Sequence, residues 1–150
     1  MLTPTKLEDV EAHIRSAING IVPRMQSGRE LMGWTPYERA SASAAKTRRY
    51  RLEWALGSWT EGGIFGLGAS DTTCQLHIIV DYTIPEQRMA EVVEDDWWQV
   101  RDVLAALALD GSRGIIQIDS QTPPSIYEEE NKDHFQADMT YTVRYLKARA

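Results

Sequence analysis

The sequence predicts an α+β fold, in which two main helices pack on a four- or five-stranded, mostly antiparallel or mixed sheet. Two stretches have the three- to four-residue periodicity of amphipathic helices, and four others have the alternation or the apolar content of strands. Their order along the chain is α-β-β-α-β-β, with a pair of strands on each side of the second helix. Because 150 residues are the size of one ordinary domain, we expect a single domain over residues 1–150.

The first predicted helix runs from Lys6 to between Asn19 and Ile21. Its apolar residues recur at helical spacing and share one face: Leu7, Val10, Ile14, Ala17, Ile18 and Ile21. Thr5 and Glu8 have the spacing of a capping box, in which each side chain accepts a hydrogen bond from a backbone N–H of the first turn. We therefore expect the helix to begin just after Thr5.

The second predicted helix, Pro85–Leu109, is the longest and the most regularly patterned. A proline suits the first helical turn, and Gly111 ends the run. The apolar stripe consists of Met89, Val93, Trp97, Val100, Leu104 and Leu107. The opposite, solvent-facing side is expected to carry Glu91, Glu94, Asp95, Asp96, Arg101 and Asp102. A stripe of this length requires a sheet beneath it.

Four strands are predicted. The first two, in residues 47–58 and 72–82, form a hairpin around a Gly-rich loop at about 57–71. The third is the apolar run 114–119, and the fourth alternates from His134 onwards.

Two further segments are predicted to be loops. Residues 23–45 form a long loop or arm, in which residues 29–34 could add a short strand. Residues 119–130 also form a loop, because Pro123 and Pro124 cannot join a central ladder.

The composition argues against several classes of protein. A formal net charge of −6 disfavours a general affinity for nucleic acid. Cys74 stands alone, so no disulfide framework is expected, and its strand position predicts a small buried residue. No apolar run is long enough to cross a membrane, and the N-terminus lacks the apolar core of a secretion signal. We therefore expect a chain that is made in a cytoplasm.

No motif for catalysis, for a cofactor or for a metal ion is present in the sequence. His13, His77 and His134 lack ligand-like spacing, and His77 is expected on the polar face of its strand. The glycines of residues 62–68 lie between strands and do not open a helix, so they do not predict a phosphate site. Consecutive acids such as Glu94–Asp96 are typical of a solvated surface. The sequence therefore predicts no enzymatic activity.

Charged clusters indicate a subunit contact instead. The one basic concentration of this acidic chain consists of Lys46, Arg48, Arg49 and Arg51. We expect Arg48, Arg49 and Arg51 to face an acidic surface of a neighbouring subunit, either the loop residues Glu128, Glu129 and Glu130 or the acidic face of the second helix. The alternative is that these arginines guard an exposed sheet edge against wrong strand pairing.

Trp97 and Trp98 are adjacent, so only one of the two rings can face the core squarely. Trp97 belongs to the apolar stripe, and Trp98 is therefore expected to mark a contact on the surface.

The order of these elements resembles that of the tail terminator, or tail completion, proteins of long-tailed bacteriophages. The resemblance covers most of the chain: the opening helix Leu7–Ile21, the hairpin with a long loop Tyr50–Tyr82, the central helix Pro85–Leu109 and the closing strand FQADMTYTVRYLKA. Related small proteins of the head-to-tail connector share this arrangement.

The resemblance implies a structural virion protein that is made in the host cytoplasm and resides in the tail or neck. It implies a ring, typically of six copies, that caps the tail tube, ends tube growth and meets the head connector. DNA would pass through the ring without sequence-specific binding. The residues that we expect at the contact between subunits are Arg48, Arg49, Arg51, Glu128, Glu129, Glu130 and Trp98.

Three other functions remain open from the sequence. The chain could be another head–tail connector or neck protein. It could be a small ligand-binding or enzymatic α+β domain whose apolar pocket is lined by Trp54, Trp59, Tyr82 and Trp97. It could also be an adaptor that binds a partner through the Trp97/Trp98 region.

Overall fold

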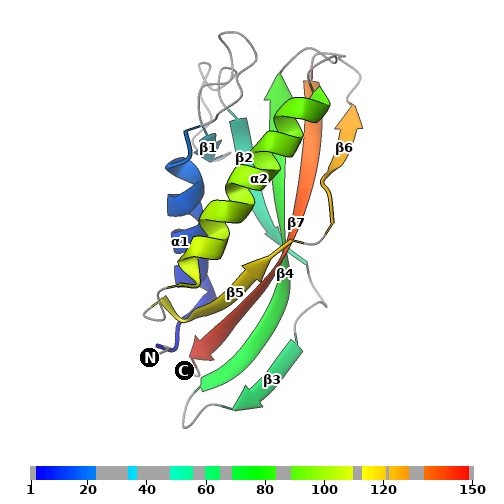
Figure 1. Cartoon of the computed structure of the whole chain (residues 1–150). Helices are drawn as coiled ribbons and strands as arrows, with labels where there is room; N and C mark the ends of the chain where they lie inside the picture. Colours follow the sequence, from blue (N-terminus) through cyan, green and yellow to red (C-terminus); the bar gives the residue numbers. More distant parts are fainter. Residues whose placement is uncertain are drawn as a thin grey trace.

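The computed structural model describes residues 3–22, 34–36, 48–55, 60–64, 69–83, 89–109, 113–120, 122–128 and 134–148 (Figure 1). Within these ranges the elements are α1 (Leu7–Asn19), β1 (Trp34–Pro36), β2 (Arg48–Trp54), β3 (Thr60–Ile64), β4 (Ala69–Thr83), α2 (Met89–Leu107), β5 (Ile115–Asp119), β6 (Ser125–Glu128) and β7 (His134–Ala148). The predicted α+β class is confirmed, and so is the order of its main elements.

The sheet is built around β4 and β7, two antiparallel strands of 15 residues that pair along their whole length. The main path through the sheet is β1-β2-β4-β7-β5, with β3 added to β4 and β6 added to β7. β2 and β6 flank one end of the central pair, and β3 and β5 flank the other. Because β4 and β5 are both antiparallel to β7, they run parallel to each other across α2.

Alternation decides which face of the central pair is buried. On β4 and β7 one face is buried and mostly apolar, with Ser70 and Thr72 as its buried polar residues at one end of β4. Its apolar residues are Cys74, Leu76, Ile78, Val80, Ala137, Met139, Tyr141, Val143 and Tyr145. Burial raises the pKa of the Cys74 thiol to about 12, so this thiol stays protonated, as expected for a small core residue. Ile79 projects to the other face and is also buried, which fits the central position of β4.

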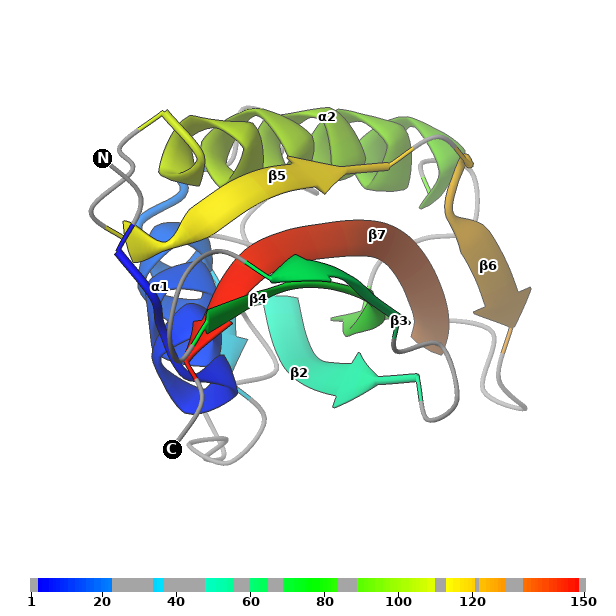
Figure 2. The same cartoon turned by 90° about the horizontal axis from the view of Figure 1, so that it is seen from below.

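Both helices pack on the apolar face, where α2 crosses the strands and α1 lies beside it (Figures 1 and 2). Two polar contacts tie α1 to β2. The Tyr50 hydroxyl donates a hydrogen bond of 2.5 Å to Asn19, and the Trp54 indole N–H donates one to Glu11. These contacts set the rotation of α1 at the edge of the core.

The capping-box prediction is wrong. The N-cap residue of α1 is Lys6, and no side chain caps the helix. Thr5 instead runs beside the end of β7, where its backbone N–H donates to Leu146 and its carbonyl accepts from Ala148. Pairing with the sheet therefore takes precedence over the local capping geometry and brings the two ends of the described chain together (Figure 1).

Two predicted loops contain edge strands. β3 lies inside the Gly-rich loop predicted for residues 57–71, and β6 lies inside the loop predicted for residues 119–130. Each of the two strands pairs on one side with a long central strand. This pairing stabilises the strand even where the local β-propensity is weak. Pro123 and Pro124 precede β6 and take no part in its ladder. The arm predicted at 23–45 lies outside the described residues except for β1, and so does Pro85.

Gly114 has a backbone conformation that a larger residue would strain. Its φ is +71°, and an added Cβ would lie 2.2 Å from the carbonyl oxygen of Thr3. We expect Gly114→Ala to lower the free energy of unfolding by about 1 to 3 kcal/mol, measured by urea denaturation. The matched control is Gly20→Ala, where φ is −85° and the added Cβ meets atoms only at 3.6 Å. Equal stability of the two variants would contradict this reading of Gly114.

Candidate interaction surface

Arg48 and Asp96 form an ion pair inside the core, which corrects two expectations. The Arg48 Nε donates to Oδ2 of Asp96 at 2.5 Å, and both side chains are fully buried. The Tyr82 hydroxyl donates to the same carboxylate oxygen at 2.7 Å. Asp96 is therefore not on the solvent-facing side of α2, and Arg48 does not lie on the surface with Arg49 and Arg51.

This buried network joins α2 to the sheet. It links α2 through Asp96 to β2 and β4, and the Arg48 guanidinium also lies 5.8 Å from the centre of the Trp34 ring on β1. Burial raises the pKa of Asp96, whereas the hydrogen bonds from Arg48 and Tyr82 act in the opposite direction. The network thus holds the helix in one position over the strands.

The two adjacent tryptophans of α2 have different environments, as predicted. Trp97 is 9% exposed, and its indole N–H donates to the Ser120 hydroxyl at 3.2 Å. Trp98 is 43% exposed, with its ring centre 5.2 Å from that of Trp97. The Arg101 guanidinium lies 5.0 Å from the Trp98 ring centre and 5.9 Å from that of Trp97, so it contacts both rings. Trp98 is thus a large aromatic side chain that is partly exposed to solvent.

An apolar groove lies beside Trp98, between the N-terminal half of α2 and the segment that leads into β6. We call it the α2–β6 groove; it has a volume of about 330 Å³ and is lined by Ala90, Val93, Glu94, Trp97, Trp98, Pro123, Pro124 and Ile126. Ile126 is 40% exposed in its wall. A second, shallower hollow beside the same tryptophan is lined by Glu91, Glu94, Asp95 and Trp98.

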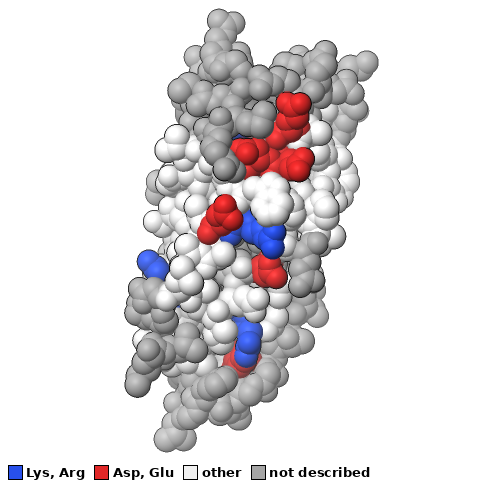
Figure 3. Space-filling view, viewed as in Figure 1, with Lys and Arg blue, Asp and Glu red and all other residues white. Residues whose placement is uncertain are grey.

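The charge around this groove is negative. Figure 3 shows acidic side chains gathered over the N-terminal half of α2, with a basic group farther along the helix. Glu91 and Glu94 are exposed, and Asp95 is partly exposed. An apolar groove with an acidic rim is suited to a partner that combines an apolar side chain with a positive charge.

The remaining predicted interface residues lie on opposite sides of the central strands β4 and β7. Arg49 and Arg51 are on β2, and Glu128 ends β6; Glu129 and Glu130 lie outside the described residues. One row of paired residues runs across the sheet from Arg51 through Ile79 and Asp138 to Ser125. The basic strand and the strand that leads to the acidic cluster are therefore separated by the two central strands.

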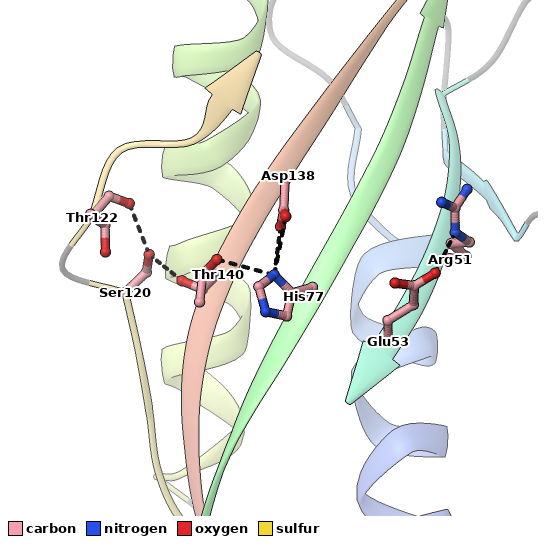
Figure 4. A network of polar contacts seen from close by, with 7 residues as sticks. All are labelled: Arg51, Glu53, His77, Ser120, Thr122, Asp138 and Thr140. Carbon is pink, nitrogen blue, oxygen red and sulfur yellow. Dashed lines mark hydrogen bonds and ion pairs between the residues drawn. The ribbon is translucent and has the colours of Figure 1, made fainter. Parts of the chain in front are cut away.

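The sheet face away from the helices is polar. His77 lies on this face, as predicted, and its Nδ1 is 2.8 Å and 3.1 Å from the two carboxylate oxygens of Asp138 (Figure 4). The Thr140 hydroxyl lies 3.3 Å from the same Nδ1. Asp138 and Thr140 therefore share one ring nitrogen, whereas the histidine of a catalytic triad uses one nitrogen for the nucleophile and the other for the carboxylate. The contact of Asp138 with His77 could not be predicted from the sequence alone.

Asp71 and Arg144 form a second polar contact on this face. The Arg144 Nε lies 2.9 Å and 3.0 Å from the two Asp71 carboxylate oxygens, and a terminal guanidinium nitrogen adds a third contact. The hydrogen bonds from Arg144 lower the pKa of Asp71 from its ordinary value of 3.8.

This shift predicts a pH dependence of stability. Because the folded-state pKa of Asp71 is below the unfolded value, the pair stabilises the fold above about pH 4, and this contribution is lost as pH falls through the lowered pKa. We expect Arg144→Gln to flatten that part of the stability-versus-pH curve, measured by urea denaturation. The control is Arg51→Gln, which removes an exposed pair with Glu53 and should change the curve little. An unchanged curve for Arg144→Gln would contradict the assignment.

Of the residues of the alternative aromatic pocket, Trp97 lines the α2–β6 groove, whereas Tyr82 is buried beneath α2 and Trp54 contacts α1. Trp59 lies outside the described residues. In the described part of the chain, no group of three or more His, Cys, Asp or Glu residues could hold a metal ion. None of the described helices has the length and apolarity that a membrane crossing requires.

Comparison with protein-family models and with curated proteins finds no match for this chain.

Proposed function

We propose that this chain is a structural subunit of a tailed-phage particle, and that it assembles into a ring that caps the tail tube. The observation that carries the proposal is the placement of two different surfaces on opposite sides of one subunit. The basic residues Arg49 and Arg51 are on β2, on one side of the central strands β4 and β7, and the acidic end of β6 is on the other side. A head-to-tail contact between such surfaces closes into a ring when its rotation permits.

The proposed contact places the β2 side of one copy against the β6 side of the next. Arg51 is 34% exposed and pairs with Glu53 within its own strand at 2.8 Å. A neighbouring acidic cluster would add a further partner for this guanidinium. The resemblance of the element order to tail terminators supplies the place in the particle: between the tail tube and the head connector, with DNA passing through the ring.

The charge contact has a direct test. We expect Arg49→Glu combined with Arg51→Glu to convert rings into monomers, because like charges would then face each other; native mass spectrometry measures the outcome. Adding Glu128→Lys, Glu129→Lys and Glu130→Lys to the same chain restores opposite charges and should restore the ring. Rings that persist in the first variant, or that do not return in the second, would contradict the proposed contact.

The place in the particle needs a separate test. Purified tail tube protein of the same phage is allowed to polymerise with and without this chain, and tube lengths are measured by electron microscopy. A cap ends growth, so tubes should be shorter and should carry this chain at one end. Tubes that grow to unchanged lengths would remove the terminator role and favour another connector or neck position.

A further inference from the structure

We propose that the α2–β6 groove binds an extended segment of a partner protein that places a large apolar side chain in the groove and an adjacent Lys or Arg against its acidic rim. The groove lies on the β6 side of the subunit, but its lining includes none of the charged residues of the proposed ring contact, Arg49, Arg51 and Glu128. The proposal therefore holds whether or not the chain forms a ring. Only the identification of the partner as another tail protein rests on the proposed function.

The size and lining of the groove indicate the apolar anchor. A volume of about 330 Å³ accommodates one large side chain, and the walls present Val93, Trp97 and Ile126 to it. Trp98 also lines the groove, and its ring contacts Trp97 and the Arg101 guanidinium. A half-exposed tryptophan beside an apolar hollow is the type of residue that contributes most to a binding interface.

The acidic rim indicates the charge of the partner. Glu94 lines the groove itself, and Glu91 and Asp95 lie around Trp98 on the side away from Arg101. A basic residue next to the anchor would meet several carboxylates at once, whereas an acidic one would be repelled. The groove therefore selects by charge as well as by shape.

The edge of β6 indicates that the partner segment is extended. In the described part of the chain β6 pairs with β7 alone, so every second residue of β6 directs its backbone N–H and C=O away from that partner. Ile126 pairs with Ala137 of the apolar face, and its side chain lines the groove. An added strand at β6 would thus send alternate side chains towards the groove, as in other cases of strand addition.

A peptide selection tests the proposal with the full-length chain. The probe is a library of octapeptides randomised at every position, displayed on beads and selected for binding. We expect enrichment of peptides in which a large apolar residue stands next to Lys or Arg. A selection that yields no binders, or binders without a basic residue, would overturn the proposal.

Substitutions in and around the groove test where the selected peptide binds. Trp98→Ala is expected to weaken its binding by at least about tenfold. Tyr127→Ala is the matched control, because Tyr127 lies next to Ile126 on β6 but pairs with Gln136 on the opposite sheet face, and it should bind normally. Glu91→Lys with Glu94→Lys should weaken binding of basic peptides, whereas Asp102→Lys, an exposed acid farther along α2, should not. Binding that survives Trp98→Ala would contradict the site.

Two further measurements separate this proposal from the ring. Peptides with a single N-methylated amide should lose binding at alternate positions, as strand addition requires; loss at every position or at none would contradict the extended mode. The variant Arg49→Glu, Arg51→Glu should still bind the peptide, whereas Trp98→Ala should lose the peptide even if rings form. Failure of the groove and failure of the ring therefore give different results.

Discussion

Replacing Arg48 by Met is expected to lower the free energy of unfolding by about 3 to 5 kcal/mol. The substitution leaves the Asp96 carboxylate fully buried, and among the described residues the Tyr82 hydroxyl is the donor that remains to it. An uncompensated buried charge is costly, and proton uptake by Asp96 would relieve only part of that cost. Urea denaturation followed by tryptophan fluorescence measures the loss.

The double variant Arg48→Met, Asp96→Leu is the informative control. It removes both charges and fills the space with apolar atoms, so it should be more stable than either single variant. The double-mutant cycle should therefore give a large coupling energy between the two positions. Additive losses would show that the two side chains do not interact in the folded protein, and would contradict the buried pair.

Trp97→Ala is expected to cost about 3 to 5 kcal/mol of stability, because it removes a large buried ring and leaves a cavity. The variant also leaves the Ser120 hydroxyl without the indole N–H that it accepts in the folded protein. Thermal and urea unfolding should both shift strongly, and the α2–β6 groove should lose one of its walls.

Trp98→Ala is the matched comparison one residue along the chain. The Trp98 ring is 43% exposed, so its removal should change stability by less than about 1 kcal/mol. Its effect should instead appear in binding at the groove. Comparable destabilisation by the two substitutions would contradict the assignment of Trp97 to the core and Trp98 to a contact surface.

The main elements could be predicted from the sequence because their periodic hydrophobic patterns extend over many residues. The stripe from Val93 to Leu107 and the alternation of β7 each repeat many times, so few other structures bury those residues. β3 and β6 have only five and four residues, and their existence depends on pairing with β4 and β7. Non-local pairing of this kind leaves little trace in the short strand itself.

The buried pair was missed although positional signals exist for both residues. Asp96 lies three residues after Val93 and four before Val100, so it shares the helical face of the apolar stripe. Arg48 alternates with Tyr50 and thus points to the same side of β2 as the core. The prediction placed both residues on the surface because they are charged, since charged side chains are rarely buried unless they are paired. Trp98, in contrast, could be assigned from spacing alone.

The most direct test of the proposed role is the state of assembly of the purified chain. Its native mass is measured over a concentration series, and the same samples are viewed by negative-stain electron microscopy, alone and with tail tubes present. We expect closed rings, typically of six copies, with a central opening, in solution or at the tube end. A chain that stays monomeric at high concentration and does not bind to tube ends would contradict the ring, and would direct attention to the groove as a site for a different class of partner.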